Sequence, residues 1–206
     1  MDASPWSPPA ESAPVPEVDD DDVVPFLDIW VRPGATMRFL LRTNPARGVL
    51  GIALLHGVVS MNSDGLGIGP ELLMRGLLGP VVGVLMVVLS GLLMMGIGSM
   101  FDGRGSFVDC MSAIAWGGLP STMARFAALG LVWFAPWLGE AGVWALVATV
   151  PVLVIGWSWS FLWQVVTVAE AHRFGWFEAA VTVSVPWLGM LGCFGMLMVA
   201  AFSMAA

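Results

Sequence analysis

Two long stretches of the chain carry almost no charge, and they limit the folds that it can adopt. No residue from Gly76 to Phe101 is charged, and Arg125 is the only charged residue from Cys110 to Gly139. About 20 apolar residues are enough for a helix to cross the hydrocarbon core of a bilayer. Charged residues make up 11% of the chain, whereas soluble domains contain about 25%. The sequence therefore predicts an all-α integral membrane protein and excludes an ordinary soluble domain.

We expect a bundle of five membrane-spanning helices with short interfacial helices beside it. The predicted spans are residues 48–63, 76–98, 120–137, 143–163 and 179–204. The first span is short, because a helix of that length measures only about 24 Å at 1.5 Å per residue. It would need local thinning of the bilayer.

The arginines predict the orientation, because cytoplasmic loops of membrane proteins are enriched in basic residues. With five spans, only Arg75 falls on one side and the other seven arginines fall on the opposite side. The seven are Arg32, Arg38, Arg42, Arg47, Arg104, Arg125 and Arg173. We therefore expect a cytoplasmic N-terminus and an extracytoplasmic C-terminus. The chain has no lysine, which is typical of a GC-rich genome and favours a bacterial inner membrane.

Two segments precede the membrane domain, which we place at residues 47–206. Residues 1–30 form an acidic, Pro-rich tail, and its first 22 residues carry seven acids and no base, which equals the net charge of −7. Such a composition cannot bury enough apolar surface to fold, so we expect disorder on the cytoplasmic side. Residues 31–46 predict an interfacial amphipathic helix with Met37 and Leu40 on one face and Arg38 and Arg42 on another. Packing of this helix on its own protein is the alternative.

The sequence contains no pattern typical of an active site, so we expect no enzyme, no cofactor and no metal. The two cysteines, Cys110 and Cys193, lie among apolar residues and are expected to be small buried hydrophobes. His56 and Arg125 are ionisable groups inside predicted spans, where such groups are candidates for function. Two interpretations stay open for them. One is structural, with an interhelical hydrogen bond from His56 and an Arg125 that reaches the headgroups; the other is an intramembrane polar site for an ion or a lipid phosphate.

Small residues recur at the spacing that lets helices approach closely. Gly79 and Gly83 form a GxxxG pair in the second predicted span. Packing within the bundle and dimerisation both explain such a pair.

Polar residues gather in two connections on the predicted cytoplasmic side. The first, residues 99–113, has Asp102 and Arg104 between glycines, and Ser106 as the expected N-cap of a short helix over residues 107–116. The second, residues 169–179, holds Glu170 and Glu178. Between them, the two connections supply the residues that we expect to contact a partner. These candidates are Asp102, Arg104, Asp109, His172 and Arg173.

Three segments together resemble the Yip family, membrane proteins that interact with Rab GTPases and have many bacterial relatives. They are "WVRPGATMRFLLRTNPARG", "FDGRGSFVDCMSAIAWGGLPS" and "AEAHRFGWFEAA", in that order along the chain. The resemblance covers about residues 30–204 and implies five spans with a cytoplasmic N-terminus. In eukaryotes it implies vesicle trafficking, membrane shaping and Rab binding, but a bacterial member would lack Rab partners.

Our expectation is a non-enzymatic, multi-pass membrane protein that acts as a scaffold or binds a partner at the cytoplasmic face. The expected partners are the lipid bilayer and a protein or a second copy of the chain, and no nucleic acid. The alternative is a small transporter or lipid-handling protein with a cavity near His56 and Arg125. A polar cavity between the first and third spans would favour this alternative, and a dry bundle would favour the scaffold.

Overall fold

The computed structural model describes residues 23–62 and 70–189, and every regular element within these ranges is helical. A last helix, at residues 176–189, follows the labelled elements. The labelled elements are α1 (Pro25–Asp28), α2 (Pro33–Thr43), α3 (Val49–Met61), α4 (Pro70–Ser99), α5 (Phe107–Gly117), α6 (Leu119–Phe134), the 3₁₀ turn η2 (Ala135–Leu138) and α7 (Ala141–His172). The predicted all-α fold class is confirmed.

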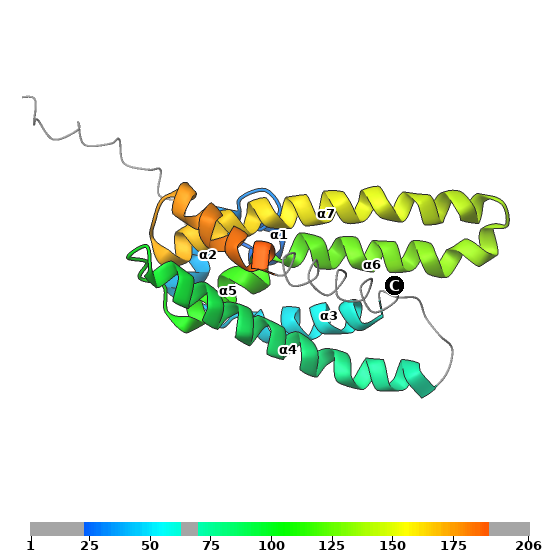
Figure 1. The fold of residues 1–206 in the computed structure, drawn as a ribbon, viewed down its shortest axis with the longest axis horizontal. Helices are drawn as coiled ribbons and strands as arrows, with labels where there is room; N and C mark the ends of the chain where they lie inside the picture. Colours follow the sequence, from blue (N-terminus) through cyan, green and yellow to red (C-terminus); the bar gives the residue numbers. More distant parts are fainter. Residues whose placement is uncertain (1–22, 63–69, 190–206) are drawn as a thin grey trace, which may run out of the picture.

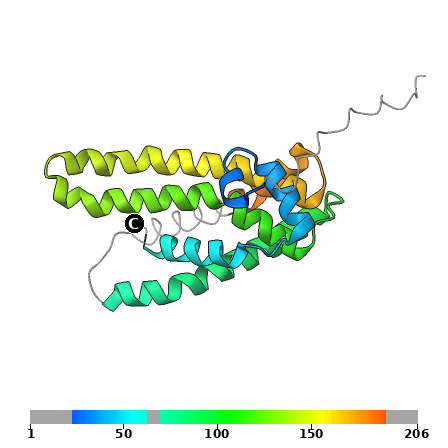
Figure 2. The same cartoon turned by 180° about the vertical axis from the view of Figure 1, so that it is seen from behind.

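Two helix pairs, α3 with α4 and α6 with α7, give the molecule its elongated shape (Figure 1). The short helices α1, α2 and α5 gather at one end of these pairs, together with the start of the last helix (Figures 1 and 2). The connections 44–48, 100–106 and 173–175 also lie there, so we call this the loop end. The α6–α7 turn lies at the opposite end.

The helices differ in how far they could extend across a membrane. Within the described residues, Leu73–Ser99 and Ala141–His172 are the two helices long and apolar enough to cross a membrane. With 13 residues, α3 is only about 20 Å long, and α6 with 16 residues about 24 Å. Both are shorter than the roughly 30 Å hydrocarbon core. The fifth predicted span runs past residue 189, outside the described residues, so the count of five stays a prediction.

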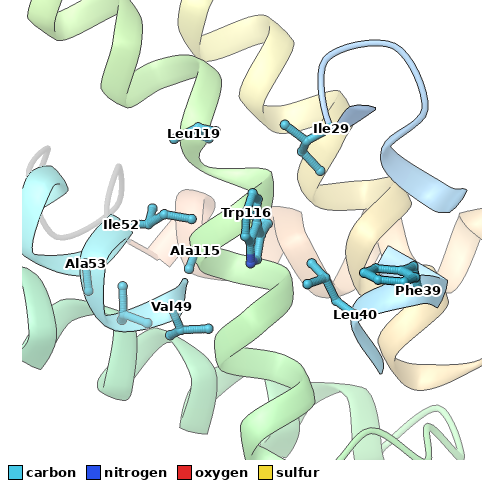
Figure 3. Packing of buried hydrophobic residues seen from close by; sticks show 10 residues of the cluster. Ile29, Phe39, Leu40, Val49, Ile52, Ala53, Ala115, Trp116 and Leu119 are labelled. Atoms are coloured by element: carbon cyan, nitrogen blue, oxygen red, sulfur yellow. The ribbon is translucent and has the colours of Figure 1, made fainter. Parts of the chain in front are cut away.

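A core at the loop end joins helices from distant parts of the sequence (Figure 3). Trp116 of α5 is its largest buried side chain, and its indole Nε1 donates a hydrogen bond of 3.1 Å to the carbonyl oxygen of Arg47. Ile29, Leu40, Val49 and further apolar residues surround it. Each indole that is removed from water contributes a large apolar area and needs one acceptor, and both conditions are met here.

The acidic tail ends earlier than predicted. Residues 1–22 lie outside the described residues, but residues 25–30 pack on the bundle instead of belonging to a disordered tail. Ile29 is buried, and its carbonyl oxygen accepts a hydrogen bond of 2.6 Å from Trp163 Nε1. Trp30 meets the edge of Trp159 with ring centroids 5.9 Å apart. The apolar run that includes Ile29 and Trp30 explains the difference, because it gives this segment surface to bury.

The predicted amphipathic helix exists, and it uses its apolar face against the protein. Met37 and Leu40 of α2 are fully buried, whereas Arg38 and Arg42 are on the outer side. The structure therefore supports the alternative of a helix that packs on its own bundle.

Glycines bring α3 and α4 into backbone contact. A Cβ on Gly57 would lie 2.6 Å from the Gly83 nitrogen, and one on Gly79 would lie 3.0 Å from the Gly57 carbonyl oxygen. Cβ atoms essentially never approach backbone atoms to less than 3.0 Å, and they seldom approach them to 3.0 Å. The GxxxG pair of the sequence thus packs within the bundle.

Candidate functional site

The loop end is built around the buried imidazole of His172, the last residue of α7. The ring is 1% exposed and lies parallel to the ring of Phe174, with centroids 4.9 Å apart. Its Nε2 is 3.4 Å from the Cys110 thiol of α5. Its Nδ1 is buried and has no hydrogen-bond partner among the described residues. His172 therefore joins α5 and α7 at the loop end.

The glycines of residues 98–105 make room for this ring. A Cβ on Gly98 or Gly103 would overlap with the imidazole, and one on Gly105 would lie 3.1 Å from His172 Nδ1. The loop is also tied to α7 through the backbone, because the Arg104 N–H donates to the carbonyl oxygen of His172 at 3.0 Å. The close approach of this segment to His172 is therefore a physical reason for its glycines.

Two charged residues of the loop end have left-handed backbone conformations. Asp102 and Arg173 both have φ of 59°, a region that residues other than glycine seldom adopt. Arg173 is the C-cap of α7, and its N–H donates to the carbonyl oxygen of Ala169. Both side chains are exposed. The two connections that carry them are therefore held in a defined shape by backbone hydrogen bonds, one of which joins Arg104 to His172.

The five predicted contact residues have different positions in the structure. Asp102, Arg104 and Arg173 are exposed at the loop end. Asp109 closes the N-terminus of α5: its carboxylate accepts from the Ser106 N–H at 2.9 Å, and its own N–H donates to Ser106 Oγ at 3.2 Å. This capping box satisfies two N–H groups at the helix start and confirms Ser106 as the N-cap. His172 is buried, so its side chain supports this surface and is not part of it.

Sequence reasoning missed the ion pair that fastens α2 to α7. Arg38 Nη1 and Glu170 Oε1 form a hydrogen-bonded salt bridge. Gly34 lies beside it, and a Cβ there would be 3.2 Å from Glu170 Oε1. The two residues are 132 positions apart, and local spacing gives no signal for such a contact.

Cys110 is buried, as expected. Burial, together with the nearby Asp109 carboxylate, raises the pKa of its thiol to about 12. A thiol of this kind is a poor nucleophile at neutral pH. Cys193 lies outside the described residues. No three His, Cys, Asp or Glu side chains come together at metal-binding distance in the described ranges.

His56 and Arg125, the two predicted intramembrane polar residues, line one cavity between α3, α4, α6 and α7. Arg125 Nη1 donates a hydrogen bond of 2.7 Å to Ser60 Oγ, and its guanidinium lies 5.7 Å from the centre of the Trp157 ring. His56 Nδ1 is 2.9 Å from Thr122 Oγ1. The structure thus brings the two residues to the same place, and it also forms the interhelical hydrogen bond of the structural interpretation.

A profile of the Yip1 domain matches residues 27–197 of the chain. The chain belongs to the Yip1 domain family. No curated protein and no solved structure matched it. The matched range contains α2, α5 and the His56–Arg125 cavity, and it leaves out residues 1–26, which carry seven acidic residues.

The three Yip-like segments of the sequence meet at the loop end of this Yip1 domain. The first forms α2 and its flanks, the second forms the glycine loop and α5, and the third contains His172. The Arg38–Glu170 pair joins the first segment to the third, and Cys110 with His172 joins the second to the third. The family resemblance is therefore concentrated where these segments pack together.

Proposed function

We propose that this Yip1 domain protein is a non-enzymatic, multi-pass scaffold of a bacterial inner membrane that binds a partner protein through its loop end. We infer five spans, with the N-terminus and the loop end in the cytoplasm and the C-terminus outside. The arginine distribution supports this orientation, because Arg32, Arg42, Arg47 and Arg104 belong to segments at one end of the molecule.

The observation that carries the proposal is an exposed charged surface on a fixed base. Asp102, Arg104 and Arg173 are exposed at the loop end, and neither arginine has an ion pair with another described residue. The exposed Trp176 lies three positions beyond Arg173. Arginine and tryptophan are the residue types that most often dominate the binding energy of protein interfaces. A loop whose shape is already fixed loses little conformational entropy when it binds.

A charge reversal at the loop end tests the proposal. We expect the double variant Arg104→Glu and Arg173→Glu to lower the affinity of a stoichiometric partner by at least about tenfold, which corresponds to roughly 1.4 kcal/mol. The partner is captured by cross-linking in intact membranes before mild detergent is added, so that a second copy of the chain and a different protein are distinguished by mass. Glu140→Arg, an exposed reversal at the opposite end, is the matched control.

The outcome against the proposal is a folded double variant that keeps every cross-linked partner at the level of the wild type and of Glu140→Arg. Thermal unfolding of each purified variant shows whether it is folded. Arg104 and Arg173 are suitable for this test because their side chains are exposed, while the backbone groups that hold the loop stay in place.

A further inference from the structure

The cavity beside His56 and Arg125 has the size and the lining of a ligand site. Its volume is about 390 Å³, within the range of roughly 300–1,000 Å³ that small-molecule sites have. Its walls are mostly apolar, with Ile52, Val87 and Met94 among them. Met86 and Leu93 of α4 also line it and are 50% and 48% exposed. The cavity therefore reaches the apolar outer surface of the bundle.

Arg125 brings a positive charge to this cavity. A guanidinium has five N–H donors, and the Ser60 hydroxyl is the one hydrogen-bond acceptor that it meets in the described ranges. No carboxylate among the side chains that the structure describes forms an ion pair with it. The Trp157 ring covers it at 5.7 Å, which stabilises a cation only in part. In surroundings of low dielectric, an anion that accepts the remaining N–H groups would offset the cost of burying this charge.

His56 adds a hydrogen-bond acceptor to the same cavity. The Thr122 hydroxyl donates its hydrogen to the carbonyl oxygen of Gly118 at 3.2 Å. With that hydrogen on the Gly118 carbonyl, Thr122 Oγ1 accepts from His56 Nδ1–H across the 2.9 Å between them. In this tautomer of the neutral ring, the lone pair of Nε2 is available to a ligand. The site offers a forked cation and a neutral acceptor, which suits a phosphate with a hydroxyl group on it or close to it.

We propose that this cavity binds the phosphate of an anionic lipid, with Arg125 as its charge partner. The headgroup lies between α3 and α6, Ser60 and His56 hold it in position, and the acyl chains leave along the exposed side of Met86 and Leu93. A free phosphate ester has the same charged group, but it leaves the apolar walls of the cavity without a ligand. The inference is independent of the partner that the loop end binds.

Lipid titration of the delipidated, full-length protein in mild detergent tests the inference, with bound lipids counted by native mass spectrometry. The probes are phosphatidic acid, phosphatidylglycerol, phosphatidylcholine and inorganic phosphate. We expect one site that prefers the two anionic lipids to phosphatidylcholine and is not blocked by inorganic phosphate. Arg125→Gln should weaken that site by about 10- to 100-fold, the size of a lost hydrogen-bonded charge contact. Arg75→Gln, which lies outside the cavity lining, should leave it unchanged.

A second variant keeps the test decisive if Arg125→Gln does not fold. Ser90 lines the cavity, and Ser90→Leu fills it while Arg125 and its partners stay in place. This variant should also lose the anionic lipid. Equal binding of phosphatidylcholine and anionic lipids, or anionic-lipid binding that survives in both Arg125→Gln and Ser90→Leu, would overturn the proposal. Binding of inorganic phosphate without lipid, dependent on Arg125, would overturn the assignment to a lipid.

Discussion

Replacement of Gly83 by alanine tests whether backbone contact between α3 and α4 holds the bundle together. A Cβ at Gly83 would lie 2.6 Å from the Gly57 nitrogen and 2.7 Å from the Gly57 Cα, and it would overlap with the Ala53 carbonyl oxygen. All three neighbours are backbone atoms, so the overlap cannot be relieved by the rotation of a side chain. Carbon atoms pack best at about 3.5–4.0 Å. The two helices must therefore move apart by roughly 1 Å along their contact.

The expected cost follows from that displacement. Forced insertion of one methyl group into a packed core costs about 1–3 kcal/mol. A gap of 0.5–1 Å also removes roughly a quarter to a half of the dispersion attraction between the atoms on its two sides. Alanine in a helix interior is more favourable than glycine by up to about 1 kcal/mol. This helix propensity stabilises the variant and offsets part of the packing cost. We expect Gly83→Ala to lower the free energy of unfolding by about 2 kcal/mol relative to a control that has the same gain.

Gly96→Ala is that control, because Gly96 lies in the same helix and no described atom comes within 4 Å of its Cβ position. Unfolding is measured by titration of SDS into detergent micelles, with far-ultraviolet circular dichroism as the signal. Gly83→Ala should unfold at a lower SDS fraction than the wild type, and Gly96→Ala at the same or a higher fraction. Equal stability of the two variants would refute the backbone contact between α3 and α4. Dimerisation would then be the explanation of the GxxxG pair.

Three further predictions concern the loop end. Gly103→Ala should cost about 1–3 kcal/mol in the same SDS titration, because its methyl group would overlap with the His172 ring; unchanged stability would mean that the ring is not held there. Asp109→Ala removes the capping box and should cost about 1 kcal/mol, while a loss below 0.3 kcal/mol, roughly, would argue against the cap. In a Cys193→Ser background, Cys110 should resist iodoacetamide in the folded protein at pH 8 and react after unfolding. Its pKa is raised to about 12, so the thiolate that reacts is scarce at pH 8 and stays scarce until the pH approaches that value; rapid labelling of the folded protein at pH 8 would contradict this burial.

Local signals in the sequence were sufficient for two of the short helices, α2 and α5, but not for α1, which was placed in the disordered tail. The predicted helix over residues 107–116 corresponds to Phe107–Gly117, because Ser106 and Asp109 form its start within four residues. Pro33 likewise marks the start of α2. The ends of the long helices were harder to predict. The predicted span of residues 143–163 ends nine residues before α7 does, because hydropathy detects the apolar part of a helix and not its continuation to His172.

The role of His172 could not be predicted from its own neighbours. It lies between charged residues in the sequence, a pattern that favours an exposed position. It is buried because Gly98, Gly103 and Gly105, on a segment about 70 residues earlier, leave space for its ring. The glycines themselves were the available signal, because glycine permits another group to approach the backbone closely. They do not identify which residue approaches. The five predicted contact residues stay a prediction, and their separation into an exposed set and a buried or capping set required the fold.

The small residues of α3 and α4 also connect the stability of the bundle to the cavity. Gly57 and Gly83 meet at the helix contact and line the cavity. Because neither has a side chain, α3 lies directly against α4, and the space between α3 and α6 stays wide enough for His56 and Arg125. A bulky residue at either glycine would push α3 toward α6 and reduce that space. The glycines belong to α3 and α4, and the ionisable residues belong to α3 and α6. Only the fold shows that the close contact between α3 and α4 leaves room for His56 and Arg125 between α3 and α6.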